Sequence, residues 1–584
     1  MGNGDVKVVI ASGDEGKTGY LFQRPDAILE THIPGEVLPL LQEVNRATAA
    51  GKCAAGYLAY EAGSALDGAM QPCVGVTNGT PLAWFGIFAG AEEVHMPDCD
   101  EGAGFRTGSW QPSMSAAEHA AALHKIREYL RSGDTYQVNF TLRLRTTFEG
   151  DPWSLFCRIH CNQRARYSAF IETGKFAVCS ASPELFFQLD GDALLSKPMK
   201  GTSRRGLTSA DDDSLALCLR ESAKERAENI MIVDMVRNDM GRIAFPGTVE
   251  ASSIFDVERY PTVLQMVSTV TCRTTVDLPE IIRALFPCAS VTGAPKIRTM
   301  QIINELEPDA RGVYTGCAGY VMPGRHARFN VAIRTVVVDK RSGAAEYGAG
   351  GGIVWDSEAG SEYRECLVKG EVLTTSRPRC DLLETLLWES EGGYFLLEDH
   401  LTRLAGSAAY FGVRVDIQEI RKKLYEEVDG VSRAARKVRL LVSEGGRVSI
   451  ESMPLETPVT GKVWLVGLSG EPVDSGSPYL YHKTTNRSVY DSARASRPGC
   501  DDVLLVNARG EVTESTIANV VVEMNGSRFT PPVSCGLLPG TFRNWLVRRG
   551  EIEERVLTPA DLLASDRLFL VNSVRRWIPA RLTR

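Results

Sequence analysis

Two pairs of glutamates carry the clearest chemical signal in this sequence, Glu225/Glu228 and Glu362/Glu365. Each pair has i,i+3 spacing inside a segment whose composition predicts a helix, so the two carboxylates of a pair share one helix face. Two such faces brought together would make an oxygen-rich site that suits Mg²⁺ better than a softer metal. On spacing alone, solvated surface helices explain these pairs better, because Glu-x-x-Glu is common. The surrounding motifs decide between the two explanations.

Length and composition describe the protein that must position these carboxylates. A chain of 584 residues is too long for one ordinary core, so we expect two or more domains. The hydrophobic content of 43% and charged content of 24% are typical of globular proteins. A net charge of −8 argues against nucleic acid and anionic membranes as partners. With no apolar run of about 20 residues and no signal-peptide pattern, we expect a cytoplasmic location.

The 14 cysteines are scattered singly along the chain. Cys157 and Cys161 are close in sequence, but no partner cluster lies at the spacing of a zinc site. In a large chain without an export signal, such cysteines are usually reduced thiols that fill core space. We therefore predict neither a structural zinc ion nor a disulfide framework.

A composition shift near residue 376 predicts the main boundary, with one block at 1–375 and a second at 376–584. Both blocks mix strand and helix patterns, which predicts an α/β (α+β) fold class, and consecutive strands with short turns favour antiparallel sheets covered by helices. In the first block we predict strands at 168–172, 176–180, 184–189, 247–251, 313–322, 328–338 and 344–354, and helices at 116–131, 153–161, 211–238, 279–285, 296–305 and 359–372. In the second block we predict strands at 394–397, 437–443, 447–452, 462–468, 502–506 and 518–523, and helices at 399–410, 416–427, 540–549 and 559–563.

The segment that ends at Gly16-Lys17-Thr18 imitates a phosphate-binding loop. In such a loop the lysine opens a helix whose N-terminal amides face phosphate. Here the following residues do not read as a helix, and Ala11 replaces the first glycine. We interpret the match as accidental.

Six ordered motifs in the first block resemble the chorismate-binding enzyme family. They are Ser182–Glu184, Pro198–Thr202, Ala227–Asp239, Thr292–Lys296, Ala332–Thr335 and Gly348–Ile353, completed by Glu362-x-x-Glu365-x-x-x-Lys369. The resemblance covers most of residues 50–375 and implies an antiparallel β-sandwich flanked by helices. It also implies that the substrate is chorismate, which carries two carboxylates.

The resemblance assigns substrate and metal roles to residues of this block. It implies Mg²⁺ held by Glu228 and Glu365, with Glu225 and Glu362 beside them, bridging to the ring carboxylate. Arg334 suits the enolpyruvyl carboxylate, although a buried salt-bridge network would alone be the better explanation of that arginine. Further substrate-binding residues are Gly201, Thr202, Gly350, Gly351 and Lys369, where glycines allow the backbone to approach an anion closely.

Lys200 distinguishes members of the family. Anthranilate synthases have a small residue at this place in the motif, whereas aminodeoxychorismate synthases resemble this chain in having lysine. The family mechanism implies that Lys200 attacks C2 of chorismate while the 4-hydroxyl leaves, and that ammonia then attacks C4 and expels the lysine. An amine beside a cation should have a lowered pKa, which leaves free nucleophile near neutral pH. Glu184 is then the general acid that protonates the departing hydroxyl.

Gln265 departs from the anthranilate synthase pattern, which has a histidine there linked to pyruvate elimination. Some aminodeoxychorismate synthases keep that histidine, so the departure disfavours pyruvate loss in this block without deciding the product. The sequence has no Gly-x-Cys-x-Gly turn with a downstream His-x-Glu. We therefore expect ammonia to come from a separate glutamine amidotransferase subunit.

The second block resembles the fold-type IV pyridoxal-phosphate enzymes, which include branched-chain and D-amino-acid aminotransferases and aminodeoxychorismate lyase. The matching stretches are Glu398–Leu404, Tyr481–Asn486, Val512–Asn519, Leu538–Thr541 and Phe569–Ser573. The resemblance implies a two-subdomain fold and pyridoxal 5'-phosphate as cofactor. Because the lyase family often dimerises through this fold, a homodimer is an open expectation.

The same resemblance assigns the cofactor site. Lys483 is the lysine expected to bind the cofactor aldehyde, although a lone loop lysine would usually lie on the surface. Glu514 would keep the pyridine nitrogen protonated, so that the ring acts as an electron sink. Arg403, Thr541 and Ser573 would bind the phosphate. Arg439 is a weaker candidate for a substrate carboxylate.

The two blocks together suggest one pathway. The first would make 4-amino-4-deoxychorismate from chorismate, and the second would eliminate pyruvate from it to give the 4-aminobenzoate of folate synthesis. Two alternatives stay open. One is an anthranilate-type synthase fused to a branched-chain or D-amino-acid aminotransferase, which Lys200 and Gln265 disfavour. The other is that one block is a non-catalytic scaffold, which the intact lysines and acidic pairs disfavour.

Overall fold

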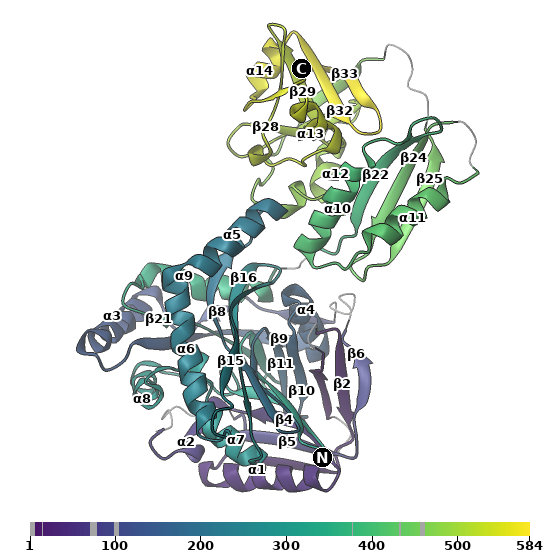
Figure 1. Ribbon diagram of the computed structural model, residues 1–584. Coiled ribbons are helices and arrows are strands. Elements are labelled where there is room, and N and C mark those ends of the chain that lie inside the picture. The colour runs from purple at the N-terminus through teal and green to yellow at the C-terminus, as the bar shows by residue number, and fades with distance from the viewer. Residues whose placement is uncertain are drawn as a thin grey trace. The chain divides into compact units, whose positions relative to one another are not determined.

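The computed structural model describes residues 6–13, 16–70, 79–97, 104–375, 378–430, 434–455 and 462–583. Its internal contacts divide the chain into two units (Figure 1). The first unit consists of Met1–Arg204 and Ala216–Arg377, and the second consists of Arg205–Leu215 and Pro378–Arg584. A single boundary near residue 376 therefore does not account for residues 205–215, which belong with the second unit. The predicted mixed fold class is confirmed.

Two antiparallel sheets form the centre of the first unit, with eleven and ten strands in the described part of the chain. The eleven-stranded sheet contains β1 Lys7–Ala11, β2 Thr18–Gln23, β6 Glu92–His95, β7 Phe105–Thr107, β8 Gln111–Pro112, β9 Gln137–Gly150, β10 Tyr167–Glu172, β11 Phe176–Ser182, β17 Gly293–Ala294, β20 Thr335–Asp339 and β21 Ala344–Ile353. The ten-stranded sheet contains β3 Ala27–Thr31, β4 Cys53–Leu58, β5 Ala83–Phe88, β12 Leu185–Asp190, β13 Ala193–Lys197, β14 Met199–Arg204, β15 Glu250–Arg259, β16 Val263–Arg273, β18 Cys317–Met322 and β19 His326–Val331.

The two sheets pack face to face, and the side-chain alternation of the strands explains how. On β1, Val8 and Ile10 contribute to a core shared with β4 and β18 of the other sheet, whereas Val9 faces the helices. On β4, Tyr57 faces the shared core and Ala54 faces the opposite helix layer. Successive strand residues point to opposite faces, so each sheet buries both faces. The first unit is thus a sandwich of two sheets between two helix layers.

Helices cover the outer faces of this sandwich. Helices α1 and α7, with part of α6, pack on the ten-stranded sheet, and α3, α4 and α9 pack on the eleven-stranded sheet. Side-chain caps explain where several begin, including Ser115 before α3 and Asp277 before α7. The helices are α1 Pro34–Ala49, α2 Gly63–Leu66, α3 Ala116–Ser132, α4 Pro152–Gln163, α6 Ala223–Gly241, α7 Leu278–Leu285, α8 Lys296–Leu306 and α9 Ala359–Gly370, while α5 Ser209–Glu221 contributes residues to both units.

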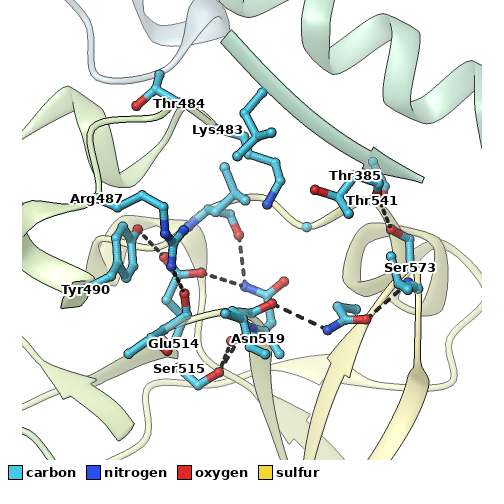
Figure 2. Close-up of a pocket in the computed structure, with 18 of the residues that line it drawn as sticks. Thr385, Lys483, Thr484, Arg487, Tyr490, Glu514, Ser515, Asn519, Thr541 and Ser573 are labelled. Carbon is cyan, nitrogen blue, oxygen red and sulfur yellow. Dashed lines mark hydrogen bonds between the residues drawn. The ribbon is translucent and has the colours of Figure 1, made fainter. Parts of the chain in front are cut away.

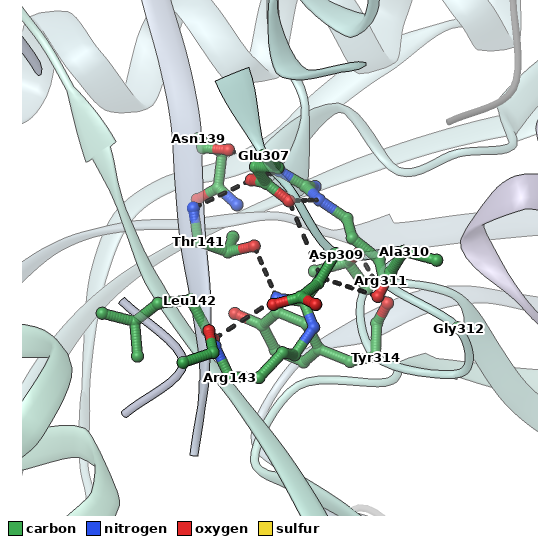
Figure 3. A network of polar contacts seen from close by, with 12 residues as sticks. Asn139, Thr141, Leu142, Arg143, Glu307, Asp309, Ala310, Arg311, Gly312 and Tyr314 are labelled. Atoms are coloured by element: carbon green, nitrogen blue, oxygen red, sulfur yellow. Dashed lines mark hydrogen bonds and ion pairs between the residues drawn. The ribbon is translucent and has the colours of Figure 1, made fainter. Parts of the chain in front are cut away.

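A buried polar network ties strand β9 to the turn after α8 (Figure 3). The Glu307 carboxylate accepts from Arg311 at 2.7 Å and from the backbone N–H of Thr141 at 2.9 Å. Arg143 lies 3.7 Å from the same carboxylate and donates to the Thr141 hydroxyl at 2.8 Å. These charges compensate one another, which is the condition under which ionised groups stay buried. The network therefore stabilises the fold.

The second unit has two sheets, which form two subdomains. A four-stranded antiparallel sheet contains β22 Leu382–Glu389, β23 Gly393–Tyr394, β24 Arg436–Val442 and β25 Val448–Pro454. An eight-stranded mixed sheet contains β26 Trp464–Leu468, β27 Asp502–Val506, β28 Val512–Ser515, β29 Asn519–Met524, β30 Ser527–Thr530, β31 Glu553–Glu554, β32 Arg567–Asn572 and β33 Arg576–Leu582. Both counts refer to the described residues. The helices are α10 Leu397–Phe411, α11 Ile417–Glu427, α12 Ser488–Ala495, α13 Thr541–Arg548 and α14 Pro559–Ala564.

Three further expectations can be compared with the structure. Lys17 precedes a strand, β2, instead of a helix, so the phosphate-loop match is accidental. Cys161 is disulfide-bonded, so the expectation of reduced thiols is wrong at this position. Among the described residues, no helix combines the length and apolar character needed to cross a membrane.

Candidate active sites

Lys200 lies in β14, at the edge of the ten-stranded sheet. Its neighbours are fixed by pairing with β16, which sets Thr202 opposite Gln265. Gln265 donates to the Gly201 carbonyl at 2.8 Å and accepts from the Thr202 hydroxyl at 3.0 Å. Gly201 has a φ of +98°, a conformation that glycine adopts without strain. The amide that replaces the family histidine therefore holds the backbone beside Lys200.

The Lys200 amine points at the backbone of β21. A Cβ placed on Gly352 would lie 2.5 Å from Lys200 Nζ and 2.2 Å from the Gln137 amide nitrogen, so a larger residue there would require the ends of both side chains to move. Burial lowers the pKa of Lys200, and the nearby Lys369 cation lowers it further, while Glu228, Glu184 and Glu365 oppose the shift. The result is an amine that gives up its proton more easily than a free lysine, as a nucleophile requires.

Glu184 follows β11 and is buried, with 2% of its surface exposed. Burial raises the pKa of its carboxyl to about 7, against smaller opposing effects of Ser290, Lys200 and the Met199 backbone. Within the described part of the chain, its Oε1 atom has no hydrogen-bond partner. A carboxyl group that keeps its proton near neutral pH and has an uncommitted oxygen is suited to general-acid chemistry.

The four predicted metal ligands lie on two helices, Glu225 and Glu228 on α6 and Glu362 and Glu365 on α9. Burial raises the pKa of Glu228, and the neighbouring Glu225 and Glu365 raise it further. Burial also raises the pKa of Glu362. Burial acts in the same direction on Glu365, but the Lys369 amine at 2.6 Å outweighs it and holds the pKa of Glu365 below its usual range.

These carboxylates suit a hard cation chemically, because all four side chains offer oxygen ligands and the charge of Glu365 on α9 reaches Glu228 on α6. The structure nevertheless leaves them as pairs. Among the described residues, no group of three or more His, Cys, Asp or Glu side chains is arranged to hold a metal ion. Magnesium ligation by this set therefore stays a prediction.

The remaining predicted substrate residues surround the end of β21. A Cβ on Gly351 would lie 3.1 Å from a Glu362 oxygen, so this strand and α9 approach closely. Lys369 donates to the Gly350 carbonyl at 2.8 Å. Arg334 has a φ of +52°, a strained conformation for a non-glycine residue, and donates to the Lys369 carbonyl at 2.8 Å. The structure thus brings together Arg334, Lys369 and both glycines.

Sequence reasoning missed two amides at this site. Gln137 lies against Lys200, and both polar atoms of its amide lack a hydrogen-bond partner among the described residues. Asn229 donates to the Lys200 carbonyl at 3.2 Å and accepts from Ser268 at 2.6 Å, which links α6 to β14. Asn229 lies inside a family motif and could have been noticed. Gln137 has no local sequence signal, because β9 brings it to the site from far along the chain.

The second unit contains a cavity of about 440 Å³ with a different set of groups (Figure 2). Its lining includes the predicted substrate residue of this unit, Arg439, together with every residue predicted for the cofactor site: Arg403, Lys483, Glu514, Thr541 and Ser573. Lys483 and Thr541 both line it, and Figure 2 shows the Lys483 amine directed into the cavity. The predicted residues thus converge on one cavity.

Lys483 lies in the loop that leads to α12. Its carbonyl accepts from the Leu383 N–H of β22 at 3.0 Å, which anchors the loop to the smaller sheet. Burial lowers the pKa of Lys483 to about 8. The Arg403 and Arg487 cations also act to lower this pKa, whereas the Glu384 and Glu514 carboxylates act to raise it. More of this amine is therefore unprotonated near neutral pH than in a free lysine.

Glu514, on β28, is held on the opposite side of the cavity by three donors. Tyr490 and the Leu538 N–H donate to one oxygen at 2.8 and 3.1 Å, and Asn519 donates to the other at 3.3 Å. Burial nevertheless raises the pKa of Glu514 to about 7. A protonated ring nitrogen placed against this carboxylate would restore its charge balance, so Glu514 fits the pyridine end of the cofactor.

Arg403 and Thr541 form the other end of the cavity. Arg403 donates to both oxygens of Glu384 at 2.9 and 2.6 Å, and His400 lies 2.7 Å from the same carboxylate. Arg403 and the hydrogen bond with His400 lower the pKa of Glu384 to about 2 against the effect of burial. Thr541 opens helix α13, whose first N–H groups can receive an anion. An anchored guanidinium beside a helix N-terminus suits a phosphate group.

Three residues of this site were missed: Glu384, Tyr490 and Asn519. Asn519 ends a matched motif, so its position was available from the sequence. Glu384 and Tyr490 act through other residues, and only the packing of β22 and α12 brings them in. Lys437, two residues before Arg439 on β24, also lines the cavity. The sequence gave no signal that Lys437 belongs to this site.

Comparisons with known proteins agree with this description. The family described as chorismate binding enzyme matches residues 9–375, and the family described as amino-transferase class IV matches residues 381–582. Aminodeoxychorismate synthase component 1 of Salmonella typhimurium is 42% identical over 265 residues, and that of Escherichia coli is 40% identical over 265 residues. Each match covers 45% of this chain and 58% of the relative.

A solved structure shows the same fold for the first unit. The anthranilate synthase component I of Streptococcus pneumoniae superposes with a TM-score of 0.53 at 23% identity. The match covers 63% of this chain and 92% of that protein. At this identity the similarity establishes the fold alone.

Proposed function

The chain belongs to the chorismate-binding enzyme family, and from that membership we propose that it is a bifunctional enzyme of 4-aminobenzoate synthesis. The first unit aminates chorismate to 4-amino-4-deoxychorismate, and the second, a class IV aminotransferase domain, eliminates pyruvate from that product. The observation that carries the proposal is the pairing of Lys200 with Glu184, a lysine of lowered pKa beside a carboxyl with a pKa of about 7.

In the first reaction, the Lys200 amine attacks C2 of chorismate while the 4-hydroxyl leaves. Glu184 gives its proton to that hydroxyl, so that water departs. Ammonia then attacks C4, the bond to Lys200 breaks, and the lysine is restored. Gln265 and Asn229 support this step by fixing the backbone on both sides of Lys200.

Magnesium is the proposed cofactor of this unit, and Glu225, Glu228, Glu362 and Glu365 are the residues that would hold it. When bound, it would neutralise the carboxylates of α6 and α9 and attract the ring carboxylate of the substrate. Arg334 and Lys369, which lie beside Gly350 and Gly351, are positioned for the second carboxylate.

Pyridoxal 5'-phosphate is the proposed cofactor of the second unit, where it would supply an electron sink for the carbon that loses a proton. Lys483 would bind the cofactor through its aldehyde and would move the proton at C4 of the substrate. Glu514 would keep a proton on the ring nitrogen, and Arg403, Thr541 and Ser573 would bind the phosphate. Arg439 and Lys437 at the cavity wall provide positive charge for a substrate carboxylate.

The ammonia source is proposed to be a separate glutamine amidotransferase subunit. The relatives with 42% and 40% identity are named as component 1 of their synthase, which supports a second component here. Free ammonium should replace that subunit only at high concentration. A homodimer through the second unit belongs to the same proposal.

Product identification tests the function. The purified chain, loaded with pyridoxal 5'-phosphate, is incubated with chorismate, ammonium and Mg²⁺, and the products are separated by liquid chromatography. We expect 4-aminobenzoate and pyruvate in equal amounts. Supplying 4-amino-4-deoxychorismate directly tests the second unit alone. Anthranilate as the main product would reject the proposal.

A further inference from the structure

The residues Arg205–Asp212 begin directly after β14, which carries Lys200, yet they group with the second unit. Arg205 and Asp212 close this segment with an ion pair, at 2.6 Å and 3.0 Å between the guanidinium and the two carboxylate oxygens. Their side chains are only 8% and 2% exposed. The Gly206 N–H donates to the same carboxylate at 2.9 Å. A desolvated, two-point pair of this kind fixes the segment in one conformation.

The closed segment contacts helix α10 of the second unit at several points. Arg205 donates to the Tyr410 carbonyl at 2.9 Å, and its guanidinium lies 4.3 Å from the Tyr410 ring centre. The Tyr410 hydroxyl donates back to the Gly206 carbonyl at 2.9 Å. Ser209 donates to the Gly406 carbonyl at 2.9 Å. These reciprocal contacts hold the Tyr410 ring from both its backbone and its hydroxyl.

Tyr410 in turn holds the residue before Lys483. Its ring stacks on His482 with 4.2 Å between centroids and 29° between planes. The His482 Nδ1 atom lies 2.9 Å from the Ser407 hydroxyl. Leu207 packs against the apolar cluster that includes Leu480 and Tyr481. The segment therefore holds the residues that directly precede Lys483, partly by contact and partly through Tyr410.

Charge supports the same connection. Burial lowers the pKa of His482 to about 4, and the Arg205 cation lowers it further, while Asp212 and the Leu207 backbone act in the opposite sense. His482 is therefore a neutral ring at neutral pH, which suits stacking and a single hydrogen bond. Arg205 and Asp212, the charged groups that act on the His482 ring, belong to the segment and not to the cavity lining.

Helix α10 carries these contacts and cofactor residues on one face. Tyr410, Ser407 and Arg403 recur at spacings of three and four, which places them in line. Arg403 faces the cavity, while Ser407 and Tyr410 hold His482. On its other side, the Lys483 loop is joined to β22 through backbone bonds. On the side that faces α10, the Lys483 loop is held through His482.

We propose that the Arg205–Asp212 segment is a positioning element of the cofactor site in the second unit, which holds Tyr410 and His482 and thereby fixes Lys483 at the cavity. The cofactor and the lyase reaction are those of the proposed function. The segment touches neither, so its residues are positioning residues.

Asp212→Asn is the first test, because it keeps the shape of the side chain and removes its charge. In the full chain, we expect the dissociation constant for pyridoxal 5'-phosphate, measured by fluorescence titration of the apoprotein, to rise about tenfold. With supplied 4-amino-4-deoxychorismate, kcat should fall about tenfold while KM changes less than about twofold, since the substrate contacts are intact. An unchanged dissociation constant and kcat would overturn the proposal.

The double variant Arg205→Met/Asp212→Leu guards against misfolding, because replacing both partners of a buried pair with apolar groups usually preserves stability. We expect native thermal stability but weakened cofactor binding, since the bonds from Arg205 to Tyr410 are gone. A stable double variant with native cofactor affinity would show that the segment has only a structural role.

Arg421→Gln is the matched control. It removes an ion pair with Glu398 on the same helix α10, where Glu398 is 72% exposed. We expect native cofactor affinity and kcat. The cofactor titration does not depend on the reaction, so it separates the two proposals. If the native chain fails to convert 4-amino-4-deoxychorismate, the proposed function fails while the titration still tests the positioning role.

Discussion

Lys200 and Lys483 are both lysines with a lowered pKa, but their electrostatic surroundings differ. Burial lowers the pKa of Lys483 to about 8, and two cations, Arg403 and Arg487, act in the same direction against two carboxylates. Around Lys200, one cation, Lys369, acts in the same direction as burial against three carboxylates. The nearby charges therefore favour the unprotonated amine more at Lys483 than at Lys200. Protonating or neutralising the carboxylates near Lys200 would lower the pKa of that lysine further.

This difference matches the two tasks proposed for these lysines. The lysine of a resident cofactor must be reactive before any substrate arrives. A lysine that attacks the substrate can remain partly protonated until the substrate and its metal alter the charge around it. Near each lysine lies a buried glutamate with a pKa of about 7, Glu184 near Lys200 and Glu514 near Lys483. The two sites therefore have similar acids and differ in their cations.

The largest expected effect comes from Lys200→Ala. Removing the nucleophile should lower the amination rate by about 10⁴-fold or more, because no other group can carry the substrate. Conversion of supplied 4-amino-4-deoxychorismate should stay native. Loss of chorismate and formation of 4-aminobenzoate are followed by liquid chromatography, and unchanged synthase turnover would contradict the nucleophile role.

Lys483→Ala should produce the opposite pattern. Chorismate is still aminated, but 4-amino-4-deoxychorismate accumulates because 4-aminobenzoate formation falls by about 10³-fold or more. Borohydride treatment, which fixes the cofactor to the native lysine, should leave the variant without bound cofactor, as read by mass spectrometry. Native aminobenzoate output would remove Lys483 from the mechanism.

Glu184→Gln should have a smaller effect, a loss of about 10²- to 10⁴-fold in amination. In the native chain, synthase kcat/KM should fall as pH rises through about 7, since Glu184 then loses the proton that it donates. The variant should lack this descending limb. A profile that keeps the limb at its native position would assign it to another group.

The same substitution tests the sign of a stability effect. Because the pKa of Glu184 is raised in the folded state, the native chain loses stability as pH rises from the unfolded value toward about 7. Glutamine carries no charge, so the variant should gain about 1–3 kcal/mol relative to native at pH 8 and little at pH 5. Thermal unfolding at the two pH values measures the difference.

Gln265→Ala should have the smallest effect. It removes two hydrogen bonds that hold Gly201 and Thr202, each worth about 1 kcal/mol. We expect a three- to tenfold loss of kcat/KM for chorismate, on the scale of about 1 kcal/mol, with no change at the second site. A loss as large as that of Glu184→Gln would show that the amide takes part in the chemistry.

The predicted helices match most helices of the structure, whereas many strands, including β4, β5 and β16, were not predicted. Interruptions within the predicted elements were also missed. The predicted helix 211–238 is two helices, because Ser222 caps α6 by accepting from the Glu225 N–H. That Ser-x-x-Glu pattern is a start signal that could have been recognised. The predicted strand 328–338 is also divided, since Arg334 at a φ of +52° leaves the sheet between β19 and β20. Such strain has no sequence signature.

Strand β9 was missed for a different reason. Its first eight residues are all buried, so it lacks the alternation by which a half-exposed strand is recognised. Gln137, at its start, reaches Lys200 only through the pairing of β9 with β21. The motif residues were predictable because family resemblance assigns them one by one. Their partners Gln137, Glu384 and Tyr490 depend on long-range packing.

The path of the chain between its two units limits how the gene could be divided. The polypeptide passes between the two units three times, after residues 204, 215 and 377. A gene split after residue 377 would yield two chains that each match one family, but the fragment of the second unit would lack the segment proposed to position Lys483. Exchange of either half with a free-standing homologue would therefore require compensating changes on the surface of α10.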